Sequence, residues 1–219
     1  ILIVVFVEHL LLIPPLLILT MGYPGSGKTF FARQFSEEYN IPRISEDNIR
    51  YELFEKPTFA TEETEIIDRI QNYALTEVLK TGNTIICEGQ YLQATRRKAV
   101  HDLATKNGYR VLTVWLQTDV QTSAARAMRR DRRNPDSKYS FEIDKATFLK
   151  IREQLHRPSD KEAFVVISGK HAFKSQALTV LRKITSVYSE SIAKGEFNVK
   201  NGAPTNPRPL RARPTTLIQ

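Results

Sequence analysis

Short apolar runs alternate with amphipathic segments along most of the chain. Continuous apolar runs at 16–21, 83–88, 110–116 and 163–168, with a weaker one at 43–45, have the character of buried strands. The segments between them repeat apolar residues at three- or four-residue spacing, which is typical of helices with one buried face. We predict helices at 28–39, 95–106, 144–155 and 175–193, and one that begins at about 120. A short helix is expected to follow Ser45 as its N-cap, and a longer one to begin at its cap Thr61 and stop at Gly82.

This alternation of strands and helices predicts an α/β fold, with a parallel sheet covered by helices on both faces. In the helix that begins at Thr61 we expect the buried face to consist of Ile66, Ile67, Ile70, Ala74 and Val78.

The two ends of the chain differ from the rest. Glu8, His9 and the pair Pro14–Pro15 interrupt the apolar segment 1–15, which leaves no run long enough for a membrane span. We therefore expect an extra strand or an unstructured lead-in at 1–15, and no contact with a membrane. Segment 195–219 is rich in proline and basic residues and is expected to be a mobile tail, so that residues 16–194 form the folded domain.

Composition indicates which kind of partner and which compartment suit the protein. The formal net charge of +8 in 219 residues favours an anionic partner, such as a nucleotide or nucleic acid. Cys87 is the single cysteine and cannot form an internal disulfide, which favours a reducing, cytoplasmic compartment.

One motif dominates the sequence. The stretch "GYPGSGKT" follows the first predicted strand, precedes the first predicted helix and fits the pattern G-x-x-x-x-G-K-[ST]. Glycines let such a loop curl around phosphate oxygens with its N–H groups pointing inward, and the positive end of the helix adds to the attraction. We predict an ATP site with Mg²⁺, in which Lys28 reaches the β- and γ-phosphates and the Thr29 hydroxyl ligates the metal. The nucleotide-binding residues would be Gly22, Pro24, Gly25, Ser26, Gly27, Lys28 and Thr29.

Three further residues follow strands at the edge of the sheet where the phosphate loop is expected. Asp47 is a candidate general base, or else only complements the positive end of its helix. Arg50 shares that helix face and would hold a substrate phosphate, orient Asp47 or form a surface ion pair. Glu88 ends a strand and is a candidate for a magnesium-bound water, or else faces solvent.

Five arginines crowd the segment 126–133. Such a cluster repels itself unless an anion neutralises it, so we predict an arginine-rich lid over the ATP phosphates rather than a solvated run of charge. Spacing alone does not identify which arginine reaches the phosphates.

The motifs together resemble those of a known group. "GYPGSGKT", "ISEDNIR", "NTIICEG" and the arginine-rich segment are similar to small P-loop kinases, the AAA-type ATP-binding proteins related to phage polynucleotide 5′-hydroxyl kinase and, more distantly, to zeta toxin. The resemblance covers about 16–184. It implies a five-stranded sheet in the order 2-3-1-4-5, Asp47 as general base, Arg50 as substrate-orienting residue, and Arg126 and Arg130 as lid arginines, with Arg130 preferred at the phosphates. Glu88 stands where the phage enzyme has an aspartate, so its role is open.

These observations predict an ATP- and Mg²⁺-dependent kinase with a hydroxyl acceptor, either a polynucleotide 5′-hydroxyl or a small molecule such as a nucleoside or sugar. Two rival functions use the same loop. One is an ATPase or nucleotide switch that transfers phosphate only to water, and the other is a nucleic-acid-binding module with residual ATP binding.

Overall fold

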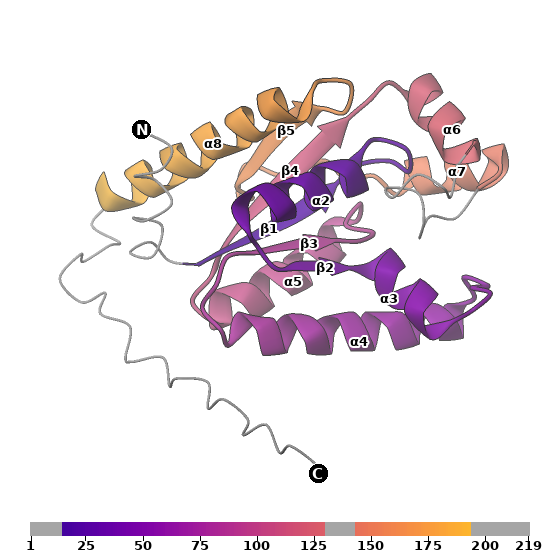
Figure 1. Ribbon diagram of the computed structural model, residues 1–219, viewed down its shortest axis with the longest axis horizontal. Helices are drawn as coiled ribbons and strands as arrows, with labels where there is room; N and C mark the ends of the chain where they lie inside the picture. Colours follow the sequence, from indigo (N-terminus) through magenta and orange to yellow (C-terminus); the bar gives the residue numbers. More distant parts are fainter. Residues whose placement is uncertain (1–14, 130–142, 194–219) are drawn as a thin grey trace, which may run out of the picture.

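The computed structural model describes residues 15–129 and 143–193. Within these residues five strands form one parallel sheet in the order β2-β3-β1-β4-β5 (Figure 1). The strands are β1 (Leu16–Met21), β2 (Arg43–Ser45), β3 (Ile85–Glu88), β4 (Arg110–Gln117) and β5 (Phe164–Ser168). The α/β fold class and the strand order predicted from the sequence are confirmed.

Helices cover both faces of the sheet, as Figure 1 shows. α2 (Lys28–Tyr39) and α8 (Phe173–Ala193) pack on one face, where Phe31, Phe35 and Val180 meet residues of β1 and β4. α4 (Thr61–Leu79) and α5 (Ala94–Lys106) pack on the other, where Leu75 and Ala104 are buried against β1 and β3. The remaining helices are α3 (Glu46–Leu53), α6 (Val120–Met128) and α7 (Lys145–Glu153).

The central strand, β1, has an almost continuous apolar sequence because it is buried on both faces. All six residues of β1 are buried, because the strand has neighbours on both sides and helices on both faces. Since every strand is parallel to the next, their carboxyl ends share one edge of the sheet. The register there places Thr20 and Ser45 opposite Glu88, so that the chain segments after β1, β2 and β3 start close together.

The predicted buried face of α4 is confirmed at Ile67 and wrong at its other four residues. Ile66 is 46% exposed, and Ile70, Ala74 and Val78 are only partly buried. Residues four apart form the buried face instead: Glu63, Ile67, Gln71, Leu75 and Leu79. Apolar content predicts the wrong face because two polar residues point inward. Glu63 accepts a hydrogen bond from the Thr58 N–H before α4, and Gln71 donates one to the carbonyl oxygen of Glu88 at the end of β3.

Thr61 is not the cap of α4. The N-cap position is Ala60, which makes no side-chain hydrogen bond to the first turn. The Glu63 carboxylate instead accepts hydrogen bonds from the backbone N–H groups of Thr58 and Phe59, just before the helix. The other helix and strand boundaries agree with the predictions to within two residues.

Three predictions fall outside the described residues: the lead-in at 1–15 apart from Pro15, the part of the arginine-rich lid at 130–133, and the tail at 195–219. Along the described ranges, none of the helices combines the length and the apolar character that crossing a bilayer requires.

We expect Phe35→Ala to lower the free energy of unfolding by about 3–5 kcal/mol, because the ring is 1% exposed and fills the core between α2 and the sheet. Tyr73→Ala is the matched control, since its ring is 69% exposed on α4 and its loss should cost less than about 0.5 kcal/mol. Urea denaturation followed by circular dichroism measures both values. Equal losses for the two variants would contradict the described core.

Candidate active site

The loop between β1 and α2 has the backbone shape that its glycines predict. Gly25 and Gly27 have φ angles of 78° and 101°, in the left-handed region that favours glycine. Gly27 is also the N-cap of α2, so the first turn of this helix opens directly onto the loop. Backbone N–H groups at a helix N-terminus form a binding site for phosphate. We refer to residues 22–29 as the phosphate loop.

Close backbone contacts fix the position of the phosphate loop. A Cβ atom on Gly25 would lie 2.2 Å from the carbonyl oxygen of Ser123 in α6. A Cβ atom on Gly169, which follows β5, would lie 1.9 Å from the carbonyl oxygen of Ser26. That Ser26 oxygen also accepts a hydrogen bond from Thr118 Oγ1 at 3.1 Å. The loop therefore sits against the ends of β4 and β5 at distances that exclude side chains.

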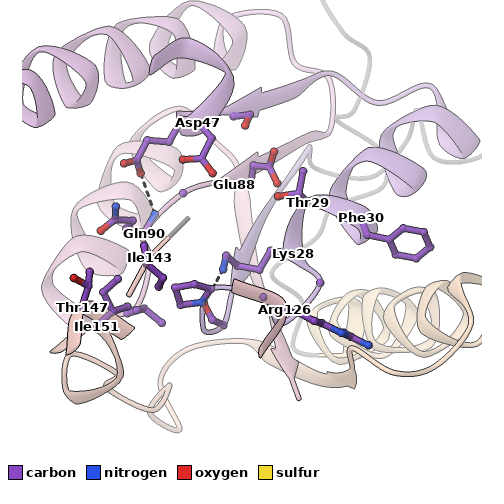
Figure 2. Close-up of a pocket in the computed structure, with 18 of the residues that line it drawn as sticks. Lys28, Thr29, Phe30, Asp47, Glu88, Gln90, Arg126, Ile143, Thr147 and Ile151 are labelled. Carbon is purple, nitrogen blue, oxygen red and sulfur yellow. Dashed lines mark hydrogen bonds between the residues drawn. The ribbon is translucent and has the colours of Figure 1, made fainter. Parts of the chain in front are cut away.

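Lys28 reaches back across the loop that precedes it. Its Nζ donates hydrogen bonds to the carbonyl oxygens of Gly22 at 2.9 Å and Tyr23 at 3.0 Å. Figure 2 shows its amine directed back toward the loop, where a dashed line marks a hydrogen bond. Lys28 thus places a positive charge beside the inward-facing N–H groups of the loop, as the motif predicts.

A cavity of about 530 Å³ connects the phosphate loop with the carboxyl ends of β2 and β3. Figure 2 shows Glu88 next to Thr29 of the loop, and Asp47 on the far side of Glu88. α3, the segment after β3, α6 and α7 complete its walls. Its lining residues are Gly22, Pro24, Gly25, Gly27, Lys28, Thr29, Phe30, Ser45, Glu46, Asp47, Phe59, Glu88, Gly89, Gln90, Leu92, Arg126, Arg129, Ile143, Thr147 and Ile151.

Glu88 occupies the edge of the sheet between the two halves of the cavity. Its carboxylate is 5% exposed, and Oε1 accepts a hydrogen bond from Arg43 Nη1 at 2.5 Å. The second oxygen, Oε2, is buried and has no hydrogen-bond partner. A buried acceptor without a partner, in the cavity that also includes Thr29, fits a divalent cation held by oxygen ligands.

Arg50 does not line the cavity and is not on the surface. Its side chain is fully buried, with Nη1 donating to Glu63 at 2.5 Å and Nη2 donating to Glu46 at 3.3 Å. The guanidinium also lies over the ring of Phe59, 4.6 Å from its centroid. Arg50 therefore positions neighbouring residues behind the part of the cavity formed by the ends of β2 and β3, rather than contacting a ligand there.

Glu46 is a functional candidate that the sequence analysis missed. It is 1% exposed yet lines the cavity, and its Oε2 accepts hydrogen bonds from the Gln90 backbone N–H at 3.0 Å and from Arg96 at 3.3 Å. Arg96 in turn contacts Asp68 of α4. Five charged residues thus form a chain behind the cavity, in the order Asp68, Arg96, Glu46, Arg50 and Glu63.

The segment after β3 is held in place by two buried polar side chains. Gln71 of α4 donates to the carbonyl oxygen of Glu88 at 3.0 Å. Arg97, 1% exposed, donates to the carbonyl oxygens of Tyr91 and Leu92 and pairs with Glu162 at 2.7 Å. These contacts fix Gly89, Gln90 and Leu92 in the cavity wall.

The described part of the predicted lid contributes two arginines to the cavity. Arg126 and Arg129 line it, and Arg126 Nη1 donates to the carbonyl oxygen of Gly169 at 3.2 Å. In Figure 2 the Arg126 side chain points away from Asp47 and Glu88. Arg130, which the resemblance favours at the phosphates, lies outside the described residues.

Cys87 takes no part in the cavity. The thiol is fully buried in β3 beside Tyr91 and Gln71, and burial raises its pKa to about 12. It is therefore not a nucleophile. Over the described ranges, no group of three or more His, Cys, Asp or Glu residues has the arrangement of a metal site.

Sequence reasoning placed the phosphate loop, Asp47 and Glu88 in one site, and the structure brings them together. It missed Glu46, Phe59 and Gln90. Glu46 directly precedes Asp47 and carries the same charge, so only its burial distinguishes the two. Phe59 and Gln90 lie in irregular segments without a periodic pattern, and nothing in the sequence indicates that they face the cavity.

The phosphate loop, its following helix and the parallel sheet define a P-loop nucleotide-binding fold. The chain belongs to the AAA domain family, whose model matches residues 17–158. No curated protein matches the sequence.

Solved structures with the same fold include proteins of different function. A gluconokinase from Sinorhizobium meliloti 1021 is 14% identical to this chain, with a TM-score of 0.58. The match covers 82% of this chain and 97% of the gluconokinase. Kti12 from Chaetomium thermophilum, in complex with ADP-AlF3, is 16% identical, with a TM-score of 0.55 and coverage of 78% and 98%. A chain of the Pnkp1/Rnl/Hen1 RNA repair complex is 24% identical, with a TM-score of 0.53 and coverage of 65% and 44%. The more specific resemblance to phage polynucleotide kinase and zeta toxin stays a prediction.

We expect Gly25→Ala to weaken the binding of a fluorescent ATP analogue by at least about tenfold, because its Cβ would collide with the Ser123 carbonyl and displace the loop. Gly82→Ala is the matched control. Gly82 also has a positive φ, of 71°, but no atom lies within 4 Å of the added Cβ. It should cost about 1 kcal/mol of stability and leave the binding of the analogue unchanged. Unchanged binding in Gly25→Ala would contradict the described loop.

Glu63 makes stability depend on pH. Burial alone would raise the pKa of its carboxyl, but hydrogen bonds from Thr58, Arg50 and Phe59 outweigh burial and lower the pKa to about 2. A carboxyl with a lowered pKa stabilises the fold above its unfolded-state pKa of about 4.3, and this contribution is lost as the pH falls toward 2.

Glu63→Gln should therefore lower the free energy of unfolding by about 1–3 kcal/mol at neutral pH, with the difference from wild type shrinking below about pH 4. Urea denaturation at a series of pH values measures it. Glu62→Gln removes an exposed charge next to Glu63 and should show no such pH-dependent difference. A loss in Glu63→Gln that stays constant down to about pH 2 would contradict the lowered pKa.

Proposed function

We propose that the protein is an ATP-dependent kinase that transfers the γ-phosphate to a hydroxyl acceptor. One observation carries the proposal: a single cavity contains the phosphate loop at one end and the Asp47 carboxylate at the other. A protein that only binds or hydrolyses ATP has no need for a walled space on the far side of the phosphates. Here that space is bounded by α3, the segment after β3 and α7.

The donor half would hold ATP through the backbone of the phosphate loop and the first turn of α2. Lys28 would exchange its hydrogen bonds to Gly22 and Tyr23 for contacts with the β- and γ-phosphates. Arg126 from α6 and Arg130 from the predicted lid would neutralise charge on the transferring group.

Thr29 and Glu88 are the residues that would hold Mg²⁺. Bound there, the ion would neutralise the charge that develops between the β- and γ-phosphates. The Thr29 hydroxyl would contact it directly, and the partnerless Oε2 of Glu88 would accept a hydrogen bond from one of its waters.

In the acceptor half, Asp47 would act as general base. The acceptor oxygen attacks the γ-phosphorus, the bond to the β–γ bridging oxygen breaks, and ADP leaves with the electron pair. Asp47 takes the proton of the acceptor hydroxyl. Arg50 would contribute indirectly, because it fixes Glu46 and the turn that carries Asp47.

We expect Asp47→Asn to lower kcat by about 10²–10⁴-fold, since the amide cannot accept the proton, while the affinity for ATP stays the same. Transfer of label from γ-labelled ATP, with Mg²⁺, to a mixture of nucleosides, sugars and a 5′-hydroxyl oligonucleotide measures the activity. Binding of a fluorescent ATP analogue measures the affinity.

Asp102→Asn is the matched control, because Asp102 is an exposed carboxylate on α5 that pairs only with neighbours on that helix. It should transfer label at the wild-type rate. Release of free phosphate alone, at the same rate in Asp47→Asn and wild type, would replace the kinase with an ATPase or nucleotide switch.

A further inference from the structure

The charges that line the cavity are segregated. Among its described lining residues the cations are Lys28, Arg126 and Arg129, all from the phosphate loop or the end of α6. The anions are Glu46, Asp47 and Glu88, all at the carboxyl ends of β2 and β3. An anionic group on the acceptor would therefore meet like charge in the acceptor half of the cavity.

Arginines near the acceptor half offset this negative charge only in part, because three guanidinium groups lie among five carboxylates, those of Glu46, Asp47, Glu63, Asp68 and Glu88. Arg43 pairs with Glu88, Arg50 with Glu46 and Glu63, and Arg96 with Glu46 and Asp68. None of these three arginines lines the cavity. Their charge is directed to carboxylates of the protein, so they do not form a binding site for a substrate phosphate.

Apolar side chains line the cavity as well. Phe59 from the segment before α4 and Leu92 after β3 contribute to it, and so do Ile143 and Ile151 at α7, which pack in the same cluster as Tyr23 of the phosphate loop. These residues come from three separate parts of the chain. Apolar walls with a few fixed polar groups are typical of pockets for small organic ligands rather than for extended polyanions.

Phe59 is held in an unusual conformation. Its φ angle is 59°, in the left-handed region that is unfavourable for a bulky residue. Glu63 accepts a hydrogen bond from its N–H at 3.3 Å, and the Arg50 guanidinium contacts a face of its ring. Two buried charged residues thus hold one aromatic side chain in the cavity wall, and strain maintained in this way points to a role in binding.

We infer that the acceptor half selects an uncharged alcohol with a flat ring, of the nucleoside or aryl-glycoside class, which packs against Phe59. This inference rests on the proposed kinase function and makes Phe59 a residue that determines specificity. An acceptor hydroxyl would reach Asp47 while the ring lies on the apolar wall. A polynucleotide end, with a phosphate on the adjacent 3′ oxygen, is disfavoured by the three carboxylates.

The net charge of the chain does not oppose this inference. Segment 194–219 has five basic residues and one acidic residue, and thus carries half of the formal net charge of +8. The basic character that pointed to nucleic acid is therefore concentrated in sequence outside the cavity-forming elements.

Matched acceptors test the inference on the full chain. We would measure kcat/KM for label transfer from γ-labelled ATP to uridine, ribose, uridine 3′-phosphate and a 5′-hydroxyl oligonucleotide. Uridine should exceed ribose by at least about tenfold, the effect of one stacked base, and should exceed both phosphate-bearing acceptors. Phe59→Ala should reduce the ratio of uridine to ribose by about tenfold, whereas Phe59→Tyr should keep it.

Calorimetric titration of uridine, in the presence of a saturating nonhydrolysable ATP analogue, separates the inference from the proposed function. Binding without transfer would support the inference and overturn the kinase. Transfer to ribose, uridine 3′-phosphate or the oligonucleotide at least as efficient as transfer to uridine would support the kinase and overturn the inference. Neither binding nor transfer would overturn both.

Discussion

Backbone contacts too close for any side chain determine where the phosphate loop lies. Gly169 and Gly25 approach carbonyl oxygens of Ser26 and Ser123 at distances that no Cβ atom tolerates. Because main chain packs on main chain, the loop is held by the ends of β4 and β5 and by α6. Lys28 adds hydrogen bonds within the loop, from its Nζ to the carbonyl oxygens of Gly22 and Tyr23. Everything on the acceptor side is positioned relative to this loop.

The opposite half of the cavity is built in a different way. There, a chain of alternating charges from Asp68 to Glu63 joins α3, α4 and α5 across positions far apart in sequence. Breaking a buried pair of this kind leaves an uncompensated charge, which is strongly destabilising, although an intact pair contributes little net stability. The chain of charges therefore specifies geometry more than it adds stability. It orients the turn that carries Asp47 and the segment that carries Phe59.

The sequence predicted the fold well because each of its signals is local. β1, the phosphate loop and α2 follow from a continuous apolar run, a glycine motif and a helical repeat, and their bounds agree with the structure. The face of α4 could not be predicted in the same way, because its inward residues Glu63 and Gln71 are polar and find their partners only in the folded chain. For the same reason the burial of Arg50 and Glu46 could not be predicted from the sequence. Tertiary partners, rather than residue type, determine which charged groups are buried.

The position of Cys87 gives the chain a reporter of its own unfolding. The only thiol of the sequence lies in β3, between β1 and β2 and beneath α4, with no exposed surface. A modifying reagent reaches it only after a neighbouring strand or α4 has moved away. Glu88 is the next residue of the strand, so movement of β1 away from β3 would also separate Glu88 from the phosphate loop. The rate at which this thiol reacts therefore measures how often the strand that carries Glu88 is uncovered, and no cysteine has to be introduced for the measurement.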